Sequence, residues 1–439
     1  MSSDQQTSVD GEVVELAQAL LRIDTSNYGD NTGPGERKAA ELVAEWLTDA
    51  DLTPEIFESV PGRASVVARI SGEDSSAPAL VVHGHLDVVP AAASDWERDP
   101  FGGEVADGVV WGRGAVDMKG ADAMILAAVR HWARTGKRPR RDIVLAFFAD
   151  EEAGGKFGAH WLVDNHPQVF EGATEAIGEV GGFSYTLPNQ LRLYLIEAAE
   201  KGIAWMKVTG RGRAGHGSMI NDTNAVTILS EAVARIGRHE FPIHMTDMVR
   251  QMLGEVAEAA GTTFDENDPE KTVELLGPLA RMASATLRDT VNPTMLSAGY
   301  KVNVIPQEAT AYLDGRFVPG RNAKDFVHDV SEILGPDVDV EVVIDDIAVS
   351  TPFEGSLADG MRRAIAAEDP EARVIPYTVS GGTDLKSLSL LGMKGYGFTP
   401  LRLPPDLDFM ALFHGINERV PVDALEFGTR VLDRFLLEA

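Results

Sequence analysis

Histidines and acidic residues follow two apolar segments of this chain, and these residue types can bind metal ions. His83–Asp87 (HGHLD) directly follows the apolar run 80–82, and Asp150–Glu152 follows the apolar stretch 143–148. Three adjacent acids repel one another strongly unless a cation lies nearby, although an ordinary solvated turn can also carry them. Imidazole nitrogens and carboxylate oxygens are zinc ligands. The two segments are therefore typical of metal-assisted hydrolysis, in which one glutamate binds metal and another takes a proton from water.

The pattern leaves two choices open. His83, His85 and Asp87 share one face of an extended segment, so spacing does not say which of them binds metal. A zinc-bound imidazole usually donates its second N–H to a carboxylate, and Asp87 is well placed to orient His85. A hydrogen-bonded core residue is the competing interpretation for His83. The residues also do not separate Glu151 from Glu152 in metal binding and proton transfer.

Three more residues complete a candidate ligand set. Asp117 lies in GRGAVDMKG, where a helix is expected to begin, so it could be a plain helix N-cap or a carboxylate that bridges two cations. Glu179 in GEVGG adds an isolated acid, and His414 in HGINE adds a second histidine. Two Zn²⁺ ions would exceed the negative charge of Asp117, Glu152 and Glu179 by one, which favours a low pKa for a water between them.

These residues need elements that bring distant segments together. The apolar runs at 80–82 and 143–148 suit strands buried on both faces of a mostly parallel sheet. The segment 121–135 between them has a helical pattern, and helical patterns also precede and follow a turn-rich loop at 27–35. This strand–helix–strand order predicts an α/β domain, in which ligand sites gather at the carboxyl ends of strands.

The middle of the chain has a different order of elements. Strands and helices are expected at 203–208, 225–236, 295–302, 308–317, 323–334 and 338–344, with an acidic, helix-rich stretch at 245–285. The α/β pattern returns with a helix at 357–367 and the glycine-rich segment SGGT at 380–383. We therefore predict an α+β unit at 201–348, inserted into a catalytic domain formed by 1–200 and 349–439.

Composition narrows the class of protein. The chain has 439 residues and a net charge of -29, which disfavours nucleic acid and anionic membranes as partners. High solubility or adaptation to high salt would explain that charge. Cysteine is absent, so disulfides and thiolate metal sites are excluded. Met1–Asp10 is polar without an apolar core, and no apolar stretch reaches membrane-spanning length, so we expect a cytoplasmic protein.

Six segments, in order from about residue 80 to 420, carry a resemblance to a known family. GHLDVVP, GRGAVDMKG, DEE, GEVGG, GGTD and HGINE resemble motifs of the di-zinc metallopeptidases that include acetylornithine deacetylase, succinyl-diaminopimelate desuccinylase, aminoacylase and glutamate carboxypeptidase. The segments 200–205, 245–285 and 298–303 look most like the branch of carboxypeptidase S and the N-acyl-amino-acid hydrolases. The resemblance implies a zinc-peptidase-like catalytic domain, with a mostly parallel mixed sheet between helices, and an inserted lid or dimerisation domain.

The resemblance also implies roles at the centre of the site. One Zn²⁺ would be held by His85, Asp117 and Glu179, and the other by Asp117, Glu152 and His414. Asp117 would bridge the two ions, with Co²⁺ or Mn²⁺ as alternative metals. The same resemblance makes Glu151 the general base, places Asp87 behind His85 and gives His83 no role.

Further roles fall on the inserted unit and on the glycine-rich segment. His216 in GHGS resembles a histidine that stabilises the oxyanion, often across a homodimer. Asn303 and Arg316 resemble residues that contact the carboxylate or carbonyl of the substrate, although a turn residue and a surface charge are the competing interpretations. Backbone N–H groups of the loop that receives the carboxylate would come from Gly381, Gly382 and Thr383.

These observations predict a hydrolase that cleaves an amide bond next to a free carboxylate. An N-acyl-amino-acid deacylase acting on a small acyl-amino acid is the first hypothesis, with water activated by metal and by Glu151. A carboxypeptidase or dipeptidase of the same mechanism, acting on short peptides, is the second. A non-catalytic binding protein on the same fold is the third, and a metal content well below one ion per chain would favour it.

Overall fold

The computed structural model describes residues 8–439, so the first seven residues of the polar stretch Met1–Asp10 lie outside the described residues. The chain divides into two compact units. Unit 1 comprises the residues up to Ala198, Thr351–Pro376 and Thr383–Ala439, and unit 2 comprises Ala199–Ser350 and Tyr377–Gly382. Among the helices within residues 8–439, none has the length and apolar character needed to cross a membrane.

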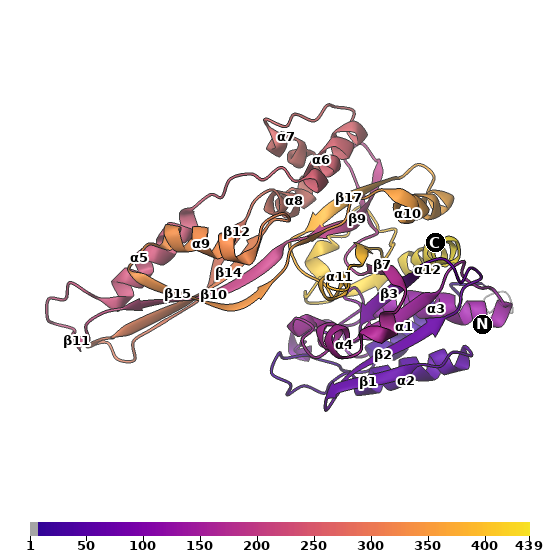
Figure 1. Cartoon of the computed structure of the whole chain (residues 1–439), viewed down its shortest axis with the longest axis horizontal. Helices are drawn as coiled ribbons and strands as arrows, with labels where there is room; N and C mark the ends of the chain where they lie inside the picture. The colour runs from indigo at the N-terminus through magenta and orange to yellow at the C-terminus, as the bar shows by residue number, and fades with distance from the viewer. Residues whose placement is uncertain (1–7) are drawn as a thin grey trace. The chain divides into compact units, whose positions relative to one another are not determined.

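Unit 1 is built on a mixed β-sheet whose central strands are parallel (Figure 1). The strand order is β1-β2-β6-β3-β7-β18-β9, and β8 and β17 also pair with β9. The strands are β1 (Glu55–Val60), β2 (Arg63–Ile70), β3 (Ala79–His85), β6 (Ile143–Phe148), β7 (Ala173–Gly178), β8 (Phe183–Thr186), β9 (Arg192–Glu200), β17 (Arg373–Val379) and β18 (Lys394–Gly397). β3 pairs in parallel with β6 and β7, and β7 with β18. The predicted α/β class is confirmed.

The central strands are buried because helices cover both faces of the sheet. Every residue of β3 and β6 is buried, as the apolar runs predict. Val81 and Phe148 share a core cluster with residues of two short helices. These are α4 (Ala159–Asn165) and α11 (Leu385–Ser389). Because side chains alternate along a strand, Leu80 and Val82 lie on the other face. Helices α1 (Val13–Leu21), α2 (Arg37–Asp49), α3 (Lys119–Thr135), α10 (Gly355–Glu368) and α12 (Val422–Glu438) form a second packed group that contacts the sheet through α2 and α3.

A smaller sheet of unit 1 joins the C-terminal part of the chain to the segment before α3. Its strand order is β19-β5-β4, with β4 (Glu104–Ala106), β5 (Val109–Trp111) and β19 (Arg419–Pro421). β19 pairs with β5 in antiparallel register, with Arg419 opposite Trp111. The residues that precede β19 therefore lie beside those that follow β5.

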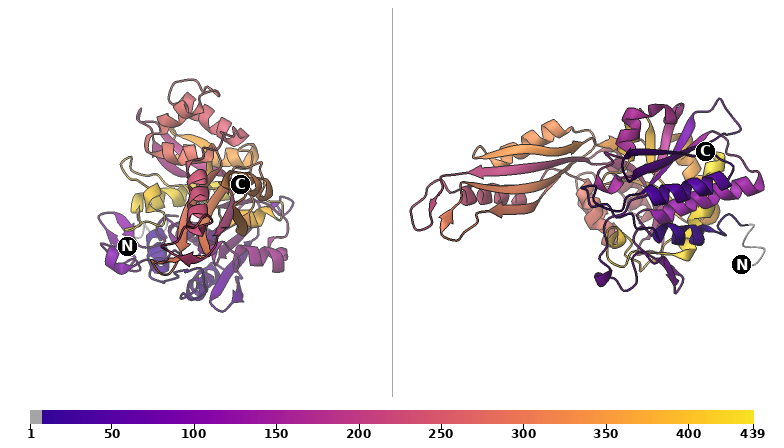
Figure 2. Two further views of the ribbon diagram at one scale, coloured as in Figure 1. Left: turned by 90° about the vertical axis from the view of Figure 1, so that its left-hand side faces the viewer. Right: turned by 90° about the horizontal axis from the view of Figure 1, so that it is seen from below.

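Unit 2 has a four-stranded antiparallel sheet in the order β12-β14-β10-β15 (Figures 1 and 2). Its strands are β10 (Gly202–Arg211), β12 (Thr290–Ala298), β14 (Glu308–Phe317) and β15 (Val338–Asp346). Helices α5 (Ala225–Arg238) and α9 (Ala323–Leu334) cover one face and share a core with alternate residues of β10, such as Met206. On the other face Trp205, Tyr312 and Ile344 are exposed.

Shorter elements complete unit 2. They are β11 (Gly215–His216), β13 (Val304–Ile305), α6 (Asp247–Ala259), α7 (Pro269–Val273), α8 (Ala280–Thr286) and β16 (Val349–Ser350), which pairs with Ala199 and Glu200. The bounds of the strand that we predicted at 295–302 were wrong, since β12 spans Thr290–Ala298. Gly299 has φ +68°, and this left-handed conformation turns the chain out of the sheet before Tyr300.

Candidate metal centre

Five predicted ligand residues converge in unit 1 because three of their strands end at one edge of the sheet. His85 is the last residue of β3, Glu179 follows β7, and Glu152 lies in a 3-10 turn directly after β6. Parallel neighbours place their carboxyl ends side by side, so these side chains meet. Asp117 lies in the loop before α3. His414 lies in the loop before β19, with φ +57°.

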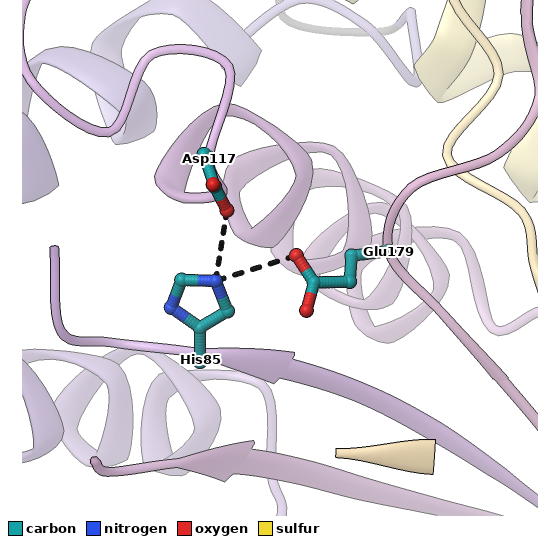
Figure 3. A group of neighbouring side chains, drawn as sticks. All are labelled: His85, Asp117 and Glu179. Atoms are coloured by element: carbon teal, nitrogen blue, oxygen red, sulfur yellow. Dashed lines mark hydrogen bonds and ion pairs between the residues drawn. The ribbon is translucent and has the colours of Figure 1, made fainter. Parts of the chain in front are cut away.

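The first donor group consists of His85, Asp117 and Glu179 (Figure 3). The Nε2 atom of His85 lies 3.0 Å from Oδ1 of Asp117 and 3.4 Å from Oε2 of Glu179. All three residues are buried. One nitrogen and two carboxylate oxygens from separate segments thus face a common point.

The second donor group shares Asp117 and adds Glu152 and His414. The Nε2 atom of His414 lies 3.0 Å from Oε2 of Glu152 and 3.2 Å from Oδ2 of Asp117. Within each group the donor atoms all lie within 4.8 Å of one another. Asp117 therefore offers one oxygen to each group, which is the arrangement of a bridging carboxylate. The His414 side chain is 55% exposed, so this group is the more accessible one.

Glu151 lies beside these groups without belonging to either of them. Its Oε2 atom is 3.9 Å from Nε2 of His85, and its side chain is 14% exposed. Glu152 instead accepts a hydrogen bond from the backbone N–H of Val89, at 3.3 Å, through its other oxygen. The geometry thus separates a carboxylate that belongs to a donor group from an adjacent one that does not.

Asp87 lies behind His85, but its carboxylate is engaged mainly elsewhere. The Nδ1 atom of His85 is 3.0 Å from the Asp87 carbonyl oxygen and 3.6 Å from its carboxylate. That carboxylate accepts hydrogen bonds from the backbone N–H groups of Glu151 (3.1 Å) and Glu152 (3.0 Å), and from the Asn27 side chain (2.9 Å). Asp87 therefore holds the turn that carries both glutamates as well as the β3 end.

Electrostatics test whether the donors suit divalent cations. Burial raises the pKa of Glu152 and of Glu179 to about 7, and burial raises the pKa of Glu151 well above its usual range. Hydrogen bonds to Asp117 and Glu152 raise the pKa of His414 to about 10. Without cations the cluster would therefore hold extra protons. Divalent ions replace such protons, and histidine nitrogens with carboxylate oxygens are zinc-type donors, so the residues fit two divalent cations that share Asp117.

His83 is a core residue, separate from both donor groups. It is buried, and burial together with the charge of His85 lowers its pKa to about 3. A Cβ atom added at Gly178 would lie 2.2 Å from the His83 ring, so the ring packs directly against β7. This placement agrees with the core interpretation of His83.

The predicted substrate-binding residues of unit 2 fall into separate places. His216 and Asn303 are close together, because Gly217 donates its N–H to the Asn303 carbonyl oxygen at 2.9 Å. Both are exposed, and Nδ1 of His216 lies 2.8 Å from the Ser218 hydroxyl. Arg316 lies on β14 and forms an ion pair with Asp314 at 2.6 Å.

The glycine-rich segment follows β17. Gly381 and Gly382 belong to unit 2, whereas Thr383 belongs to unit 1 and is buried. The Thr383 hydroxyl accepts a hydrogen bond from the backbone N–H of Leu385, the first residue of α11, at 3.1 Å. The structure thus gives Thr383 a local structural contact beside its predicted role.

Two residues around the centre were given no role by sequence reasoning. Asn27 donates to both Asp87 (2.9 Å) and Asp150 (3.0 Å) from the turn-rich loop before α2. Glu418, in the HGINE segment, is fully buried and contacts the loop of Asp117. The only sequence signal was their position in segments already noted, since their partners are far away in the chain.

The fold and the centre define a metal-dependent hydrolase. The chain belongs to peptidase family M20/M25/M40, whose profile matches residues 81–438. It is 28% identical to the N-fatty-acyl-amino acid synthase/hydrolase PM20D1 of Xenopus tropicalis, over 94% of this chain and 83% of the relative. It is 29% identical to the probable carboxypeptidase S-like 2 of Dictyostelium discoideum, over 93% and 82%. It is 25% identical to mouse (Mus musculus) aminoacylase-1, over 93% and 91%.

Solved structures show the same fold. The M20 family metallo-carboxypeptidase Sso-CP2 from Sulfolobus solfataricus superposes with a TM-score of 0.74 at 17% identity, over 97% of this chain and 98% of that one. The Bacillus subtilis YXEP protein, described as a dinuclear metal-binding peptidase of the M20 family, gives a TM-score of 0.63 at 13% identity, over 98% of each chain. The resemblance inferred from the six motifs is confirmed at the level of the family.

Proposed function

We propose that this protein is a di-zinc amidohydrolase that removes the acyl group from N-acyl-amino acids. The observation that carries the proposal is the pair of donor groups that share Asp117, with the additional carboxylate of Glu151 beside them. Relatives named as an N-fatty-acyl-amino acid synthase/hydrolase and as aminoacylase-1 support this reaction class.

The residues assigned to the metals follow from the donor groups. His85, Asp117 and Glu179 would hold one ion, and Asp117, Glu152 and His414 the other, with Zn²⁺ as the proposed metal and Co²⁺ or Mn²⁺ as substitutes. Bound ions of this kind lower the pKa of water and polarise a carbonyl oxygen. Asp117 positions both groups, because one of its oxygens faces each of them.

Glu151 would carry the proton. Its carboxylate lies outside both donor groups, so it is free to accept a proton from the water that attacks the amide carbon. The protonated Glu151 would then give that proton to the leaving amine nitrogen as the C–N bond breaks.

Recognition of the substrate carboxylate would involve two copies of the chain. Glu308 begins β14 and Arg316 lies near its end, whereas His216 and Asn303 lie on the segments before β14. Strands rise about 3.3 Å per residue, so Arg316 is roughly 26 Å along β14 from Glu308. His216 and Arg316 of one chain are thus too far apart to contact one amino-acid group. A homodimer through unit 2, with His216 stabilising the oxyanion in the partner's site, removes this difficulty.

Exposed apolar residues of unit 2 are consistent with such a dimer. Trp205, Tyr312 and Ile344 lie on the uncovered face of the sheet, and β15 is an edge strand. Uncovered apolar faces and edge strands are common association surfaces. The assignment of unit 2 as a lid and dimerisation domain, with predicted bounds of 201–348, stays a prediction. The cytoplasmic location of the protein also stays a prediction.

A carboxypeptidase or dipeptidase of the same mechanism is the second candidate. The relative named as a probable carboxypeptidase S-like 2 favours it. Both reactions break an amide bond beside a free carboxylate and release an amino acid. They differ in whether the group on the acyl side of that bond is a small or fatty acid or another amino acid or peptide. Arg316, Gly381, Gly382 and Thr383, together with Asn303 from a second copy of the chain, would bind the shared carboxylate in either case.

A hydrolysis screen distinguishes the two candidates. N-acetyl, N-succinyl and long-chain N-acyl amino acids are compared with dipeptides, each with added Zn²⁺, Co²⁺ or Mn²⁺. We expect the highest kcat/KM among the acyl-amino acids, and a strong loss when the amino-acid carboxylate is converted to an amide. Turnover of dipeptides alone would establish the second candidate, and equal turnover of the amidated substrates would contradict carboxylate recognition.

A further inference from the structure

Glu418 occupies a position at the metal centre that neither donor group explains. It immediately precedes β19, its side chain is 0% exposed, and it belongs to neither donor group. The antiparallel pairing of β19 with β5 places it beside the loop that carries Asp117. Gly112 donates its backbone N–H to the Glu418 carbonyl oxygen at 3.1 Å, which extends that pairing by one residue.

One carboxylate oxygen of Glu418 holds the loop of Asp117. Oε1 accepts three backbone N–H groups, from Gly114 at 3.1 Å, Val116 at 2.7 Å and Asp117 at 3.0 Å. The loop before α3 contains no regular hydrogen-bonded element over 112–118, so its amides need such an acceptor in the protein interior. This oxygen therefore fixes the backbone from which Asp117 reaches both donor groups.

The other oxygen of Glu418 binds an arginine that reaches the second histidine. Oε2 accepts a hydrogen bond from Nη1 of Arg113 at 2.6 Å, and Nη2 of Arg113 lies 3.4 Å from the carbonyl oxygen of His414. His414 has φ +57°, a conformation that a residue with a side chain rarely adopts and that neighbouring contacts must maintain. Arg113 supplies one such contact on the backbone of His414 itself.

We propose that Glu418 is a positioning residue that fixes where Asp117 and His414 lie relative to each other. These two ligands are almost 300 residues apart in the sequence. The inference rests on the proposed metal centre. Oε1 fixes the backbone of Asp117, which both donor groups share, and so supports both groups. Oε2, through Arg113, supports only the group that contains His414. The two oxygens thus have separable effects, which a purely structural buried ion pair does not have.

Substitution of Glu418 by glutamine separates the two effects. Three N–H groups face Oε1, so the amide of Glu418→Gln places its oxygen there and its NH₂ toward Arg113. Donor then faces donor, and the Arg113 contact is lost while the loop contact remains. Arg113→Met removes the same contact from the other side and leaves the Glu418 carboxylate unchanged. We expect both variants to weaken one of the two metal-binding steps by about 10- to 100-fold and to leave the other within about threefold.

The measurement uses the full chain, stripped of metal and titrated with Zn²⁺ in competition with a chelating indicator, and Co²⁺ absorption spectra report the two sites separately. Glu418→Ala, which removes both oxygens, is expected to weaken both steps. Glu175→Gln is the matched control, because Glu175 pairs with Arg141 at 2.6 Å at the start of β7. That control should bind both ions as the unchanged protein does.

The metal titrations of these variants decide whether Glu418 has the positioning role. If Arg113→Met and Glu418→Gln are folded by circular dichroism and bind both ions normally, the positioning role is wrong. It is also wrong if they weaken both steps equally, or if Glu175→Gln reproduces their effect. Arg113→Met decides the matter if Glu418→Gln does not fold. Failure of the unchanged protein to bind two ions would refute the proposed metal centre itself.

Discussion

The proposed catalytic groups of unit 1 and the proposed recognition groups of unit 2 differ in burial and in the contacts that hold them. Asp117 and Glu179 are buried, and the backbone or side chain of each ligand segment is fixed by contacts with other segments. His216 and Asn303 are exposed and contact mainly each other's segment. A preorganised charge cluster stabilises a transition state without reorganisation. Under the proposed function, the groups for proton transfer are already positioned within unit 1, whereas the exposed groups of unit 2 would complete their contacts only with substrate or a second copy of the chain.

Removal of the proposed base should give the largest effect. Glu151→Gln keeps the size of the side chain but cannot accept a proton, so we expect kcat to fall by about 10²–10⁴-fold. Because Glu151 belongs to neither donor group, elemental analysis should still find two metal ions per chain. A variant that keeps more than about a tenth of kcat would remove Glu151 from this role.

Substitution of His216 should give the second-largest effect, in the exposed groups of unit 2. His216→Ala should lower kcat by about 10²–10³-fold, which is typical for the loss of one oxyanion donor, and should leave metal content unchanged. His328→Ala, at an exposed position of α9, is the matched control. If His216 acts across a dimer, mixing the inactive Glu151→Gln and His216→Ala proteins should restore part of the activity. Mixtures that stay inactive after subunit exchange would show that it does not.

Substitution of Asn27 should show whether residues that contact the ligand segments, without belonging to a donor group, also help to position the metal centre. Asn27→Ala removes hydrogen bonds to Asp87 and Asp150, which hold the turn of Glu151 and Glu152. We expect metal affinity or kcat to fall by about 10- to 100-fold, as for other residues that orient ligands. Asn165→Ala, which removes one exposed contact to the Trp161 carbonyl oxygen, should change neither quantity. Equal effects of the two substitutions would contradict a role for Asn27.

A substitution on the exposed face of the unit 2 sheet should have the smallest effect on folding. Ile344→Lys alters an exposed side chain on the edge strand β15, so the free energy of unfolding of the monomer should change by less than about 0.5 kcal/mol. Self-association, measured by analytical ultracentrifugation, should weaken because a charge replaces an apolar contact. Unchanged association would move the dimer contact to another surface.

The sequence predicted the parts of the centre that local pattern can show. Apolar runs ending in His85 and in Glu151–Glu152 indicated buried strands with chemistry at their ends, and the structure brings those ends together. The choice between His83 and His85 was not available from spacing, because both lie on one face of β3. The structure separates them through the packing of His83 under Gly178, a contact between strands.

Other contacts were beyond local pattern because they depend on segments that meet only in the fold. Glu418 and Asn27 are ordinary polar residues in sequence, and their partners lie 301 and 60 residues away respectively. The end of β12 depended on the backbone conformation of Gly299 rather than on the apolar pattern at 295–302. Hydrophobic pattern thus predicted β3, which ends at His85, β6, which Glu152 follows, and several strands of unit 2, whereas the side-chain partners across the fold could not be predicted.

The pairing of β19 with β5 has a consequence for how the protein is made. A ribosome releases the segments of His85, Asp117, Glu152 and Glu179 before it has synthesised unit 2. His414 and Glu418 emerge only after that unit. A growing chain that has not yet reached His414 therefore lacks one ligand of the second donor group. The pair of donor groups that share Asp117 can therefore form only after the segments on both sides of unit 2 have been synthesised.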